Sequence, residues 1–232
     1  MQFEADSSLN PNLLNQLSSP QIPQPQISQP PSSPPELPKS DLSPSPPDPK
    51  AQLRRSLLKA RQSLPAEVWR TKSERLSTHL QASPWLAEAR TVLAYISFRQ
   101  EPDLGALFAA SSHRWGLPRC VGKSLNWHLW APEQFPLQAG SYGILEPDPA
   151  SPTLEASEVD LILVPAVACD VRGYRLGYGG GFYDRLLSHP DWANIPTIGI
   201  VFEFARLPRL PIDPWDRPMR AICTEVGLFE PK

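Results

Sequence analysis

The run Asp170-Val-Arg-Gly-Tyr-Arg-Leu-Gly-Tyr-Gly-Gly-Gly-Phe-Tyr-Asp184 holds five of the 12 glycines of the chain. It follows the apolar stretch Leu161-Ile-Leu-Val-Pro165, which is typical of a buried strand, and it leads into Tyr183–Leu187, which indicates the start of a helix. A strand, a glycine-rich loop and a helix in this order can bind phosphate, because backbone N–H groups and the helix N-terminus converge there. Glycine allows a positive φ and a close approach to the ligand. The run therefore predicts an α/β fold with a phosphate site in this loop.

A glycine-rich turn at a crossover, without any ligand, is the simpler interpretation of such a cluster. Arg175 within the run and Asp184 at its end favour the phosphate site, since they add a positive charge and a carboxylate that can hold Mg²⁺. The glycine spacing does not fit the dinucleotide fingerprint, and no Gly-Lys-Ser/Thr follows as in a Walker A loop.

Composition excludes several classes of function. With 232 residues and a formal net charge of −2, the chain is long enough for one domain and has no overall charge that favours nucleic acid or membrane surfaces. No apolar run approaches the roughly 20 residues of a membrane span. Cys120, Cys169 and Cys223 match no zinc spacing and no disulfide framework, which indicates a reducing compartment. We therefore expect a cytoplasmic protein, and its charge and hydropathy predict that it binds neither nucleic acid nor membrane. We also expect a monomer. Cys169 beside the glycine run is either a nucleophile or, more often for this residue type, a small buried side chain.

The N-terminal region differs in composition from the rest. Residues 1–49 hold 13 of the 30 prolines and no tryptophan or tyrosine. Such a segment cannot bury enough apolar surface to offset its ordering entropy, so residues 1–48 are predicted to be a disordered Pro/Ser/Gln-rich tail. The folded domain is expected to span residues 49–232, with Asp48 as the cap of its first helix and Pro49 in the first turn.

The remaining sequence alternates between helical and strand patterns. The first helix should run to Gln62, with Leu53 and Leu57 facing the core and Lys50, Arg54 and Arg61 on another face. Further helices are expected over about residues 65–81, 104–115 and 182–188. Strands are expected at residues 91–97, 116–121, 126–130, 160–165, 197–202 and 221–225, and residues 131–158 are loop-rich. This alternation predicts a single three-layer α/β domain with a mainly parallel sheet.

The glycine run also resembles a known family. Leu163-Val-Pro-Ala-Val-Ala-Cys-Asp170, then Gly173 and the stretch from Arg175 to Arg185, resemble the signature of 5-formyltetrahydrofolate cyclo-ligases, also called 5,10-methenyltetrahydrofolate synthetases. The resemblance covers about residues 50–226. It implies ATP-dependent cyclisation of 5-formyltetrahydrofolate to 5,10-methenyltetrahydrofolate, with release of ADP and phosphate. The alternatives are a non-catalytic nucleotide or phosphate-ligand sensor on the same fold, or a sugar-phosphate isomerase.

The resemblance implies an ATP site on the first helix and the glycine run. The family's Lys-x-x-x-Arg motif matches Lys50 and Arg54, although charges on a first helix are more often a solvated face. Arg175 and Tyr183 are assigned catalytic roles. The implied ATP-binding residues are Lys50, Ala51, Gln52, Leu53, Arg54, Arg175, Leu176, Gly177, Tyr178, Gly179, Gly180, Gly181, Phe182 and Tyr183.

The folate and metal sites are implied in the same way. Tyr95-Ile-Ser-Phe-Arg-Gln-Glu101 is similar to the family's folate-contacting turn, in which Glu101 would bond the polar pteridine edge. Leu210-Pro-Ile-Asp-Pro-Trp-Asp216 is similar to the element that supplies a metal-binding aspartate, with Asp216 a better match than Asp213. Mg²⁺ would lie at Asp184 and Asp216, and Arg220 stands where the family often has a further acid. The implied folate-binding residues are Ile96, Glu101, Tyr178, Gly179, Gly180, Gly181 and Phe182.

Four other residues have less definite roles. Arg119 matches a Pro-Arg pair of the family and would pair with a phosphate or a carboxylate. Glu146 lies in a family-like segment, Tyr142-Gly-Ile-Leu-Glu-Pro147, but its chemistry alone assigns it no role. Trp127 and Trp130 could stack on folate, although core packing is the better explanation.

Overall fold

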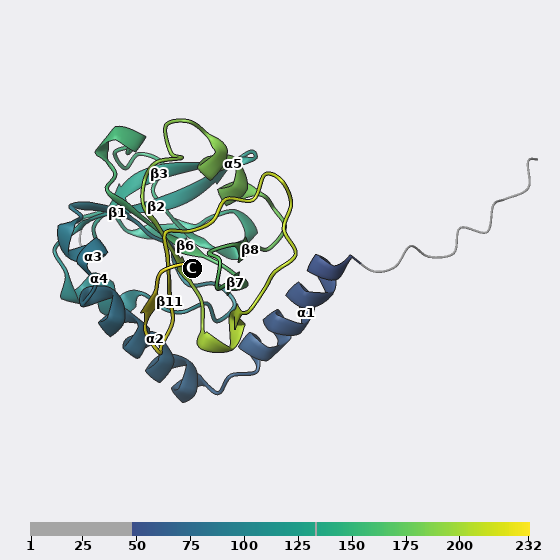
Figure 1. Ribbon diagram of the computed structural model, residues 1–232. Helices are drawn as coiled ribbons and strands as arrows, with labels where there is room; N and C mark the ends of the chain where they lie inside the picture. Colours follow the sequence, from purple (N-terminus) through teal and green to yellow (C-terminus); the bar gives the residue numbers. More distant parts are fainter. Residues whose placement is uncertain (1–47, 133) are drawn as a thin grey trace, which may run out of the picture. The chain divides into compact units, whose positions relative to one another are not determined.

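The first helix begins as its sequence predicts. The computed structural model describes residues 48–132 and 134–232 (Figure 1). The Oδ1 atom of Asp48 accepts the N–H of Lys50 at 3.0 Å. Pro49 occupies the first turn, where its missing N–H costs nothing, and α1 spans Pro49–Gln62. Apart from Asp48, the predicted tail lies outside the described residues.

Four more α-helices follow, and one of them is shorter than predicted. α2 (Ala66–Gln81), α3 (Pro84–Glu88), α4 (Gly105–Ala110) and α5 (Phe182–Ser188) complete the set in the described part of the chain. The helix expected over residues 104–115 ends at Ala110, because Arg114 pairs with Thr91 in the central sheet. Pairing with a buried neighbour strand outweighs local helix propensity there. Short 3₁₀ turns lie at Ser141–Gly143, Ala156–Glu158 and Glu203–Ala205.

The central sheet has seven strands in the order β12-β11-β9-β6-β1-β2-β3. The four inner pairings, from β11 to β2, are parallel, and the two edge pairings are antiparallel, which confirms the mainly parallel sheet. These strands are β1 (Thr91–Leu93), β2 (Arg114–Val121), β3 (Ser124–Trp130), β6 (Leu161–Pro165), β9 (Thr197–Ile200), β11 (Ala221–Cys223) and β12 (Leu228–Phe229).

Two small sheets carry strands that the sequence did not indicate. One has the order β10-β7-β8, and the other pairs β4 with β5 within residues expected to be loop. Their strands are β4 (Leu137–Ala139), β5 (Leu145–Pro147), β7 (Ala168–Asp170), β8 (Arg175–Leu176) and β10 (Arg206–Leu207).

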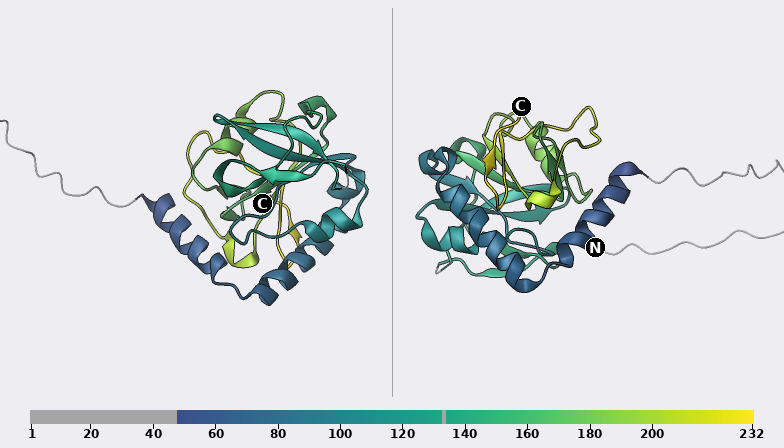
Figure 2. Two further views of the ribbon diagram at one scale, coloured as in Figure 1. Left: turned by 180° about the vertical axis from the view of Figure 1, so that it is seen from behind. Right: turned by 60° about the horizontal axis from the view of Figure 1, so that its bottom comes forward.

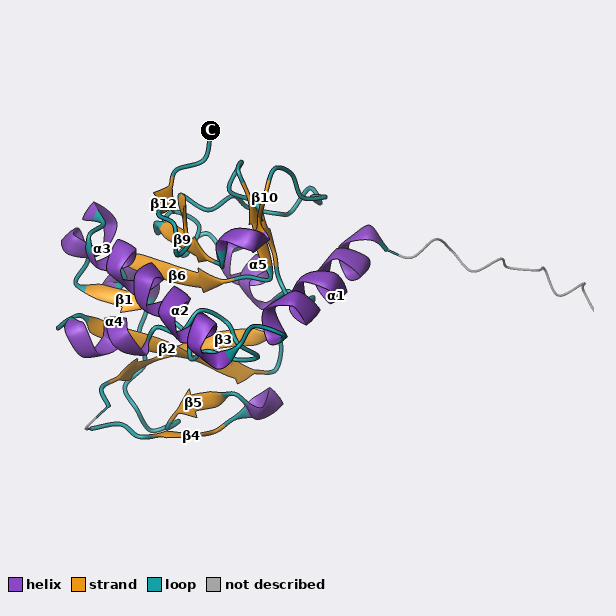
Figure 3. Ribbon diagram, turned by 90° about the horizontal axis from the view of Figure 1, so that it is seen from below, coloured by secondary structure: helices purple, strands orange, loops and turns teal. Residues whose placement is uncertain are grey.

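Helices cover both faces of the central sheet, which confirms the three-layer fold. α2, α3 and α4 lie on one face, where Leu76 and Leu80 are fully buried (Figure 3). α5 lies on the other face and packs Leu186 and Leu187 against strands β1 and β6. α1 lies at an angle to α2 (Figure 2). Its residues Leu53, Leu57 and Leu58 pack against a third hydrophobic cluster, which surrounds β7. No helix in the described part of the chain has both the length and the apolar character of a membrane span.

The order of the strands in the central sheet indicates where a ligand can bind. The chain passes from β1 to β2 on one side, whereas β6 on the other side of β1 leads to β9 and β11. Ligands of open α/β sheets bind where the strand order reverses, outside the carboxyl ends of the strands. The Ser97–Glu101 turn follows β1 and Ala166 follows β6, so both lie at this point.

Candidate active site

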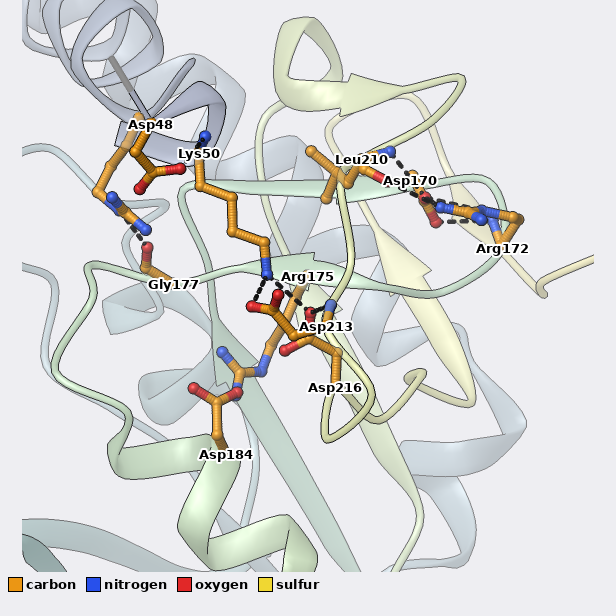
Figure 4. A network of polar contacts seen from close by, with 11 residues as sticks. Asp48, Lys50, Asp170, Arg172, Arg175, Gly177, Asp184, Leu210, Asp213 and Asp216 are labelled. Carbon is orange, nitrogen blue, oxygen red and sulfur yellow. Dashed lines mark hydrogen bonds and ion pairs between the residues drawn. The ribbon is translucent and has the colours of Figure 1, made fainter. Parts of the chain in front are cut away.

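One cation of α1 reaches an acidic loop far away in the sequence. The Nζ atom of Lys50 lies 2.7 Å from Oδ2 of Asp213 and 2.9 Å from Oδ2 of Asp216, both in the aspartate loop, residues 210–216 (Figure 4). Partial burial lowers the pKa of Lys50, but its hydrogen bonds to both aspartates outweigh this and raise the pKa above its ordinary value. Lys50 is therefore a fixed positive charge at this end of α1.

Asp213 was expected only as a neighbour of Asp216, and the structure gives it an equal contact. The N–H of Asp213 donates to Oδ2 of Asp216 at 2.8 Å, which folds the loop into a tight turn. Both carboxylates then face the same ammonium group. A sequence match to one aspartate could not show that the turn presents two.

The next turn of α1 contacts the glycine loop, residues 177–181. The Nε atom of Arg54 donates to the carbonyl oxygen of Gly177 at 2.8 Å. Gly179 has φ of 103°, and a Cβ there would lie 3.7 Å from the guanidinium carbon of Arg54. Gly181 caps α5 with φ of 68°, and a Cβ there would meet the guanidinium of Arg185 at 2.7 Å. Larger residues would be strained at both positions, so glycine lets this loop pass close to two arginines.

Arg175 and Asp184 form the second ion pair of the site. Arg175 in β8 donates through Nη2 to Oδ1 of Asp184, in the first turn of α5, at 2.5 Å (Figure 4). Its side chain is only 6% exposed, and its Nε is buried without a hydrogen-bond partner among the described residues. A buried guanidinium N–H without a partner is costly, and the described part of the structure leaves one hydrogen bond of Arg175 unmade.

Tyr183 lies under the arginine. The guanidinium carbon of Arg175 lies 5.6 Å from the centroid of the Tyr183 ring, which also packs against Trp127. Burial raises the pKa of Tyr183 far above its ordinary value, so the phenol stays protonated. Its hydroxyl is buried and has no hydrogen-bond partner in the described part of the chain.

The turn after β1 holds a buried carboxylate. Glu101 is 4% exposed, and its Oε2 accepts the N–H of Phe98 at 3.0 Å. Burial raises the pKa of Glu101 from 4.5 to about 7, opposed chiefly by the nearby charge of Arg61. Ile96, just before the turn, is half-buried against the cluster of α2, α3 and α4.

Arg61 and Asp170 connect parts of the site, and neither was assigned to it from sequence. Arg61 donates to the Tyr178 hydroxyl in the glycine loop and to the carbonyl oxygen of Arg99 at 3.1 Å. Fully buried Asp170 accepts the N–H groups of Tyr174 at 3.1 Å and of Leu210 at 2.9 Å. Asp170 thereby ties the start of the glycine run to the start of the aspartate loop.

Other candidates lie apart from these contacts. Cys169 is fully buried and its pKa is raised to about 12 by burial, so the structure favours the buried-residue interpretation over a nucleophile. Trp127 and Trp130 belong to the hydrophobic core, as expected. Arg119 lies 3.6 Å from buried Glu146, so its partner in the structure is a carboxylate.

The donor set suits Mg²⁺ chemically. Within residues 48–132 and 134–232 no group of three or more His, Cys, Asp or Glu residues is arranged to hold a metal ion. Mg²⁺ usually takes only one or two protein carboxylates, and water and phosphate oxygens complete its octahedron. Asp184 and Asp216 have such oxygens, and each of them lies beside a cation. Arg220 is exposed and adds no carboxylate.

Comparison with known proteins shows the family of the chain and agrees with its fold. The family model described as the 5-formyltetrahydrofolate cyclo-ligase family matches residues 47–225. The 5-formyltetrahydrofolate cyclo-ligase of Mycolicibacterium smegmatis is 36% identical over 192 residues, which cover 77% of this chain and 94% of that protein. The Escherichia coli K12 cyclo-ligase is 28% identical, covering 73% and 97% of the two chains.

Solved structures of two relatives share the fold. The NMR structure of Aquifex aeolicus 5,10-methenyltetrahydrofolate synthetase superposes with a TM-score of 0.69 at 33% identity, covering 78% of this chain and 92% of that one. The Mycoplasma pneumoniae synthetase has a TM-score of 0.61 at 22% identity, covering 77% and 99%, and supports the fold alone. None of these relatives bears the name of a sensor or of an isomerase. The chain belongs to the 5-formyltetrahydrofolate cyclo-ligase family.

Proposed function

We propose that this protein catalyses the ATP-dependent conversion of 5-formyltetrahydrofolate to 5,10-methenyltetrahydrofolate, with release of ADP and phosphate. One observation carries the proposal: Lys50 and Arg175 lie against carboxylates, and Arg54 lies against the glycine loop, which stands between Arg175 and Asp184 in the sequence. Phosphoryl transfer needs such an arrangement, because its catalysis rests mainly on positioning and on neutralising phosphate charge.

The chemical problem is the formyl oxygen, which is a poor leaving group. The formyl oxygen takes the γ-phosphoryl group of ATP, and ADP departs. N10 of the folate then bonds to the formyl carbon and loses its proton, the carbon–oxygen bond breaks, and the oxygen leaves with phosphate. The product carries the methenyl bridge between N5 and N10, so one ATP is consumed for each ring closed.

The proposed nucleotide site uses both ion pairs. The guanidinium of Arg175, with one N–H group unused in the structure, would bind phosphate oxygens together with the N–H groups of the glycine loop. Lys50 and Arg54 would bind phosphates from the α1 side. Charge-assisted hydrogen bonds in a partly buried site are stronger than neutral ones, so three cations can hold a triphosphate in one orientation.

Asp184 and Asp216 are proposed to hold Mg²⁺. The ion would add positive charge beside the phosphates, which neutralises charge that develops during transfer. Lys50 and Arg175 contact these same aspartates in the structure, so phosphate would take the place of carboxylate as their partner.

The proposed folate site lies between the Ser97–Glu101 turn and the glycine loop. An ionised Glu101 can accept hydrogen bonds from the N–H donors of the pteridine edge. Tyr178, which is exposed, and Phe182 offer aromatic faces, and Ile96 adds an apolar contact. Tyr183 is assigned a catalytic role because its hydroxyl is a protonated donor beside Arg175.

Product absorbance tests the function directly. The purified protein with 5-formyltetrahydrofolate should develop the absorption band of the methenyl product only when MgATP is present. ATP binding without this product would instead support the sensor, and conversion of a sugar phosphate without ATP would support the isomerase.

We further propose that residues 49–232 are the catalytic domain and that the protein acts as a cytoplasmic monomer. All residues proposed for the two substrate sites and the metal lie between Lys50 and Asp216, which supports this assignment. Size-exclusion chromatography with light scattering measures the oligomeric state, and a mass of twice 25.8 kDa would contradict the monomer.

A further inference from the structure

Arg61 is the most deeply buried charged residue of α1. Only 4% of it is exposed, whereas Arg55 on the same helix is exposed. Burying a charged group is costly unless hydrogen bonds and an opposite charge compensate it. A guanidinium has five N–H donors in a rigid fork, so a buried arginine can hold several groups in fixed positions.

The partners of Arg61 come from three separate segments. Nε donates to the carbonyl oxygen of Arg99 at 3.1 Å, and Nη1 donates to that of Ala166 at 3.4 Å. Nη2 donates to the hydroxyl of Tyr178, and the guanidinium carbon lies 5.4 Å from the centroid of that ring. These segments follow β1, follow β6 and form the glycine loop, so one side chain connects both proposed substrate regions.

The turn that Arg61 holds is strained. Arg99 and Gln100 have φ of 49° and 55°, in the left-handed region that side chains other than glycine disfavour. Such strain persists only where surrounding contacts fix it. The Gln100 amide, oriented to satisfy both of its polar atoms, donates to the carbonyl oxygens of Gln62 at 3.0 Å and Arg61 at 2.8 Å. The end of α1 therefore fixes this turn through the side chain of Arg61 and through the backbone carbonyl groups of Arg61 and Gln62.

The turn ends at Glu101, and the positive charge of Arg61 lowers the pKa of its carboxyl group. Around the carboxylate lie Arg61 from α1, Tyr178 from the glycine loop, Tyr95 after β1 and Tyr183 from α5. Asp103, two residues along the chain, adds a second negative charge near Tyr95. Burial disfavours the ionised carboxylate, and the positive charge of Arg61 favours it.

We propose that Arg61 is a positioning residue for the folate substrate, which fixes Tyr178 and the Ser97–Glu101 turn relative to each other. The inference rests on the proposed function, because it assigns Glu101 and Tyr178 to the folate site. Arg61 itself need not touch either substrate.

The test compares Arg61→Gln with Arg61→Lys, and Arg55→Gln serves as the matched control. Loss of a charge-assisted hydrogen bond should raise KM for 5-formyltetrahydrofolate by about 10- to 150-fold. KM for ATP should change much less, because Lys50, Arg54 and Arg175 remain. Arg61→Lys keeps the charge without the fork, so it should restore the pH dependence but not the full affinity. Arg55→Gln should match the parent protein.

The pH profile separates positioning from mere structural support. Without Arg61 the pKa of Glu101 rises further, so the pH at which folate binding is half-maximal should move upward in Arg61→Gln. A variant that is only less stable would melt earlier but keep the parent's pH midpoint and its ratio of the two KM values. That result would overturn the inference.

A second variant decides the matter if Arg61→Gln does not fold. Tyr178→Phe removes the hydroxyl partner on an exposed residue and should also weaken folate binding more than ATP binding. An unchanged KM for folate in Tyr178→Phe contradicts a positioning role for the contact between Arg61 and Tyr178. Where both variants fold, their effects should be non-additive, since they break one contact. If the parent protein forms no methenyl product, the proposed function fails; if it does and Arg61→Gln behaves like the parent, only this inference fails.

Discussion

Lys50 and Arg175 are each paired with carboxylates that the proposal assigns to Mg²⁺. Lys50 contacts Asp213 and Asp216, and Arg175 contacts Asp184, so in the structure the positive charges of these two residues are balanced by carboxylates. A nucleotide bound with a metal ion would supply phosphate oxygens to the two cations and the metal ion to the carboxylates. Removing a cation and removing its carboxylate should therefore have different effects, one on phosphate binding and the other on metal dependence.

Arg175→Ala should impair the use of ATP far more than folding. The lost contact is a charge-assisted hydrogen bond, worth about 1.5–3 kcal/mol, or roughly 10- to 150-fold in kcat/KM for ATP. Asp184, left without its partner, is 35% exposed and can be solvated, so the melting temperature should change little. Steady-state kinetics and thermal melting measure the two effects. Unchanged ATP kinetics in a folded variant would remove Arg175 from the site.

Asp184→Asn should fold normally yet need much more Mg²⁺ for turnover. An aspartate in the first turn of a helix also gains about 0.3–1 kcal/mol from the helix dipole, so a purely structural role is the competing explanation. Asparagine is uncharged, retains a carbonyl oxygen for Arg175 and is a poor ligand for Mg²⁺. Titration of activity with Mg²⁺ at saturating ATP distinguishes the two roles. If Asp184→Asn matches the parent's Mg²⁺ dependence, the metal assignment is wrong.

Glu101 should make the free energy of unfolding depend on pH. Its pKa is raised from 4.5 to about 7, so the folded state holds the proton to higher pH than the unfolded state. Its contribution to stability is then full below about pH 4.5 and is lost as the pH rises through about 7.

Glu101→Gln should lack this pH-dependent contribution to the free energy of unfolding. Urea unfolding of parent and variant between about pH 5 and pH 8 measures it, and the parent should lose stability relative to the variant as the pH rises. A constant difference between the two proteins over this range would mean that Glu101 titrates normally. Folate binding should follow the opposite trend, since it needs the ionised carboxylate.

At the scale of elements, α1 connects the site. Three of its cations reach the aspartate loop, the glycine loop and the Ser97–Glu101 turn, at successive positions along one face. That Lys50, Arg54 and Arg61 share a face was predictable, because their spacing is close to whole helical turns. What they contact was not, because the partners lie between 38 and 166 residues away along the chain.

Truncation tests which N-terminal residues turnover requires. Removal of residues 1–47 should leave kcat and the melting temperature unchanged, because Asp48 still caps α1 and the removed composition supports no hydrophobic core. Removal of residues 1–54 deletes the cap, Lys50 and Arg54, and should abolish turnover. A large loss in the shorter truncation would mean that the removed segment contributes to the domain.

The sequence indicated the longer elements and missed the short ones. α1 and α5 begin and end where expected, because capping residues and apolar spacing mark their limits. Strands β7, β8 and β10 have two or three residues each, too few to show a periodic pattern. β10 pairs with β7 across a sequence separation of 37 residues, whereas β7 and β8 are close in sequence, and buried Asp170 holds the adjoining loops together. Long-range contacts of this kind leave no local signal.

For the whole molecule, strand order explains why loops from distant parts of the chain meet. β1 and β6 are neighbours in the sheet. The chain goes from β1 to β2 on one side and from β6 to β9 on the other side, so the turn after β1 and the glycine run after β6 face one site. Alternating patterns predicted the parallel sheet, but they could not give the order of its strands. The solved structure of the Aquifex aeolicus relative shares this fold.

The central claim is that ATP activates the formyl oxygen of 5-formyltetrahydrofolate, and the path of that oxygen tests it most directly. The full-length protein is given MgATP and substrate carrying oxygen-18 in the formyl group, and the phosphate released is analysed by mass spectrometry. The account predicts one labelled oxygen in each phosphate, with ADP and methenyl product formed in equal amounts. Methenyl product that forms while the label appears in water instead of phosphate would contradict it.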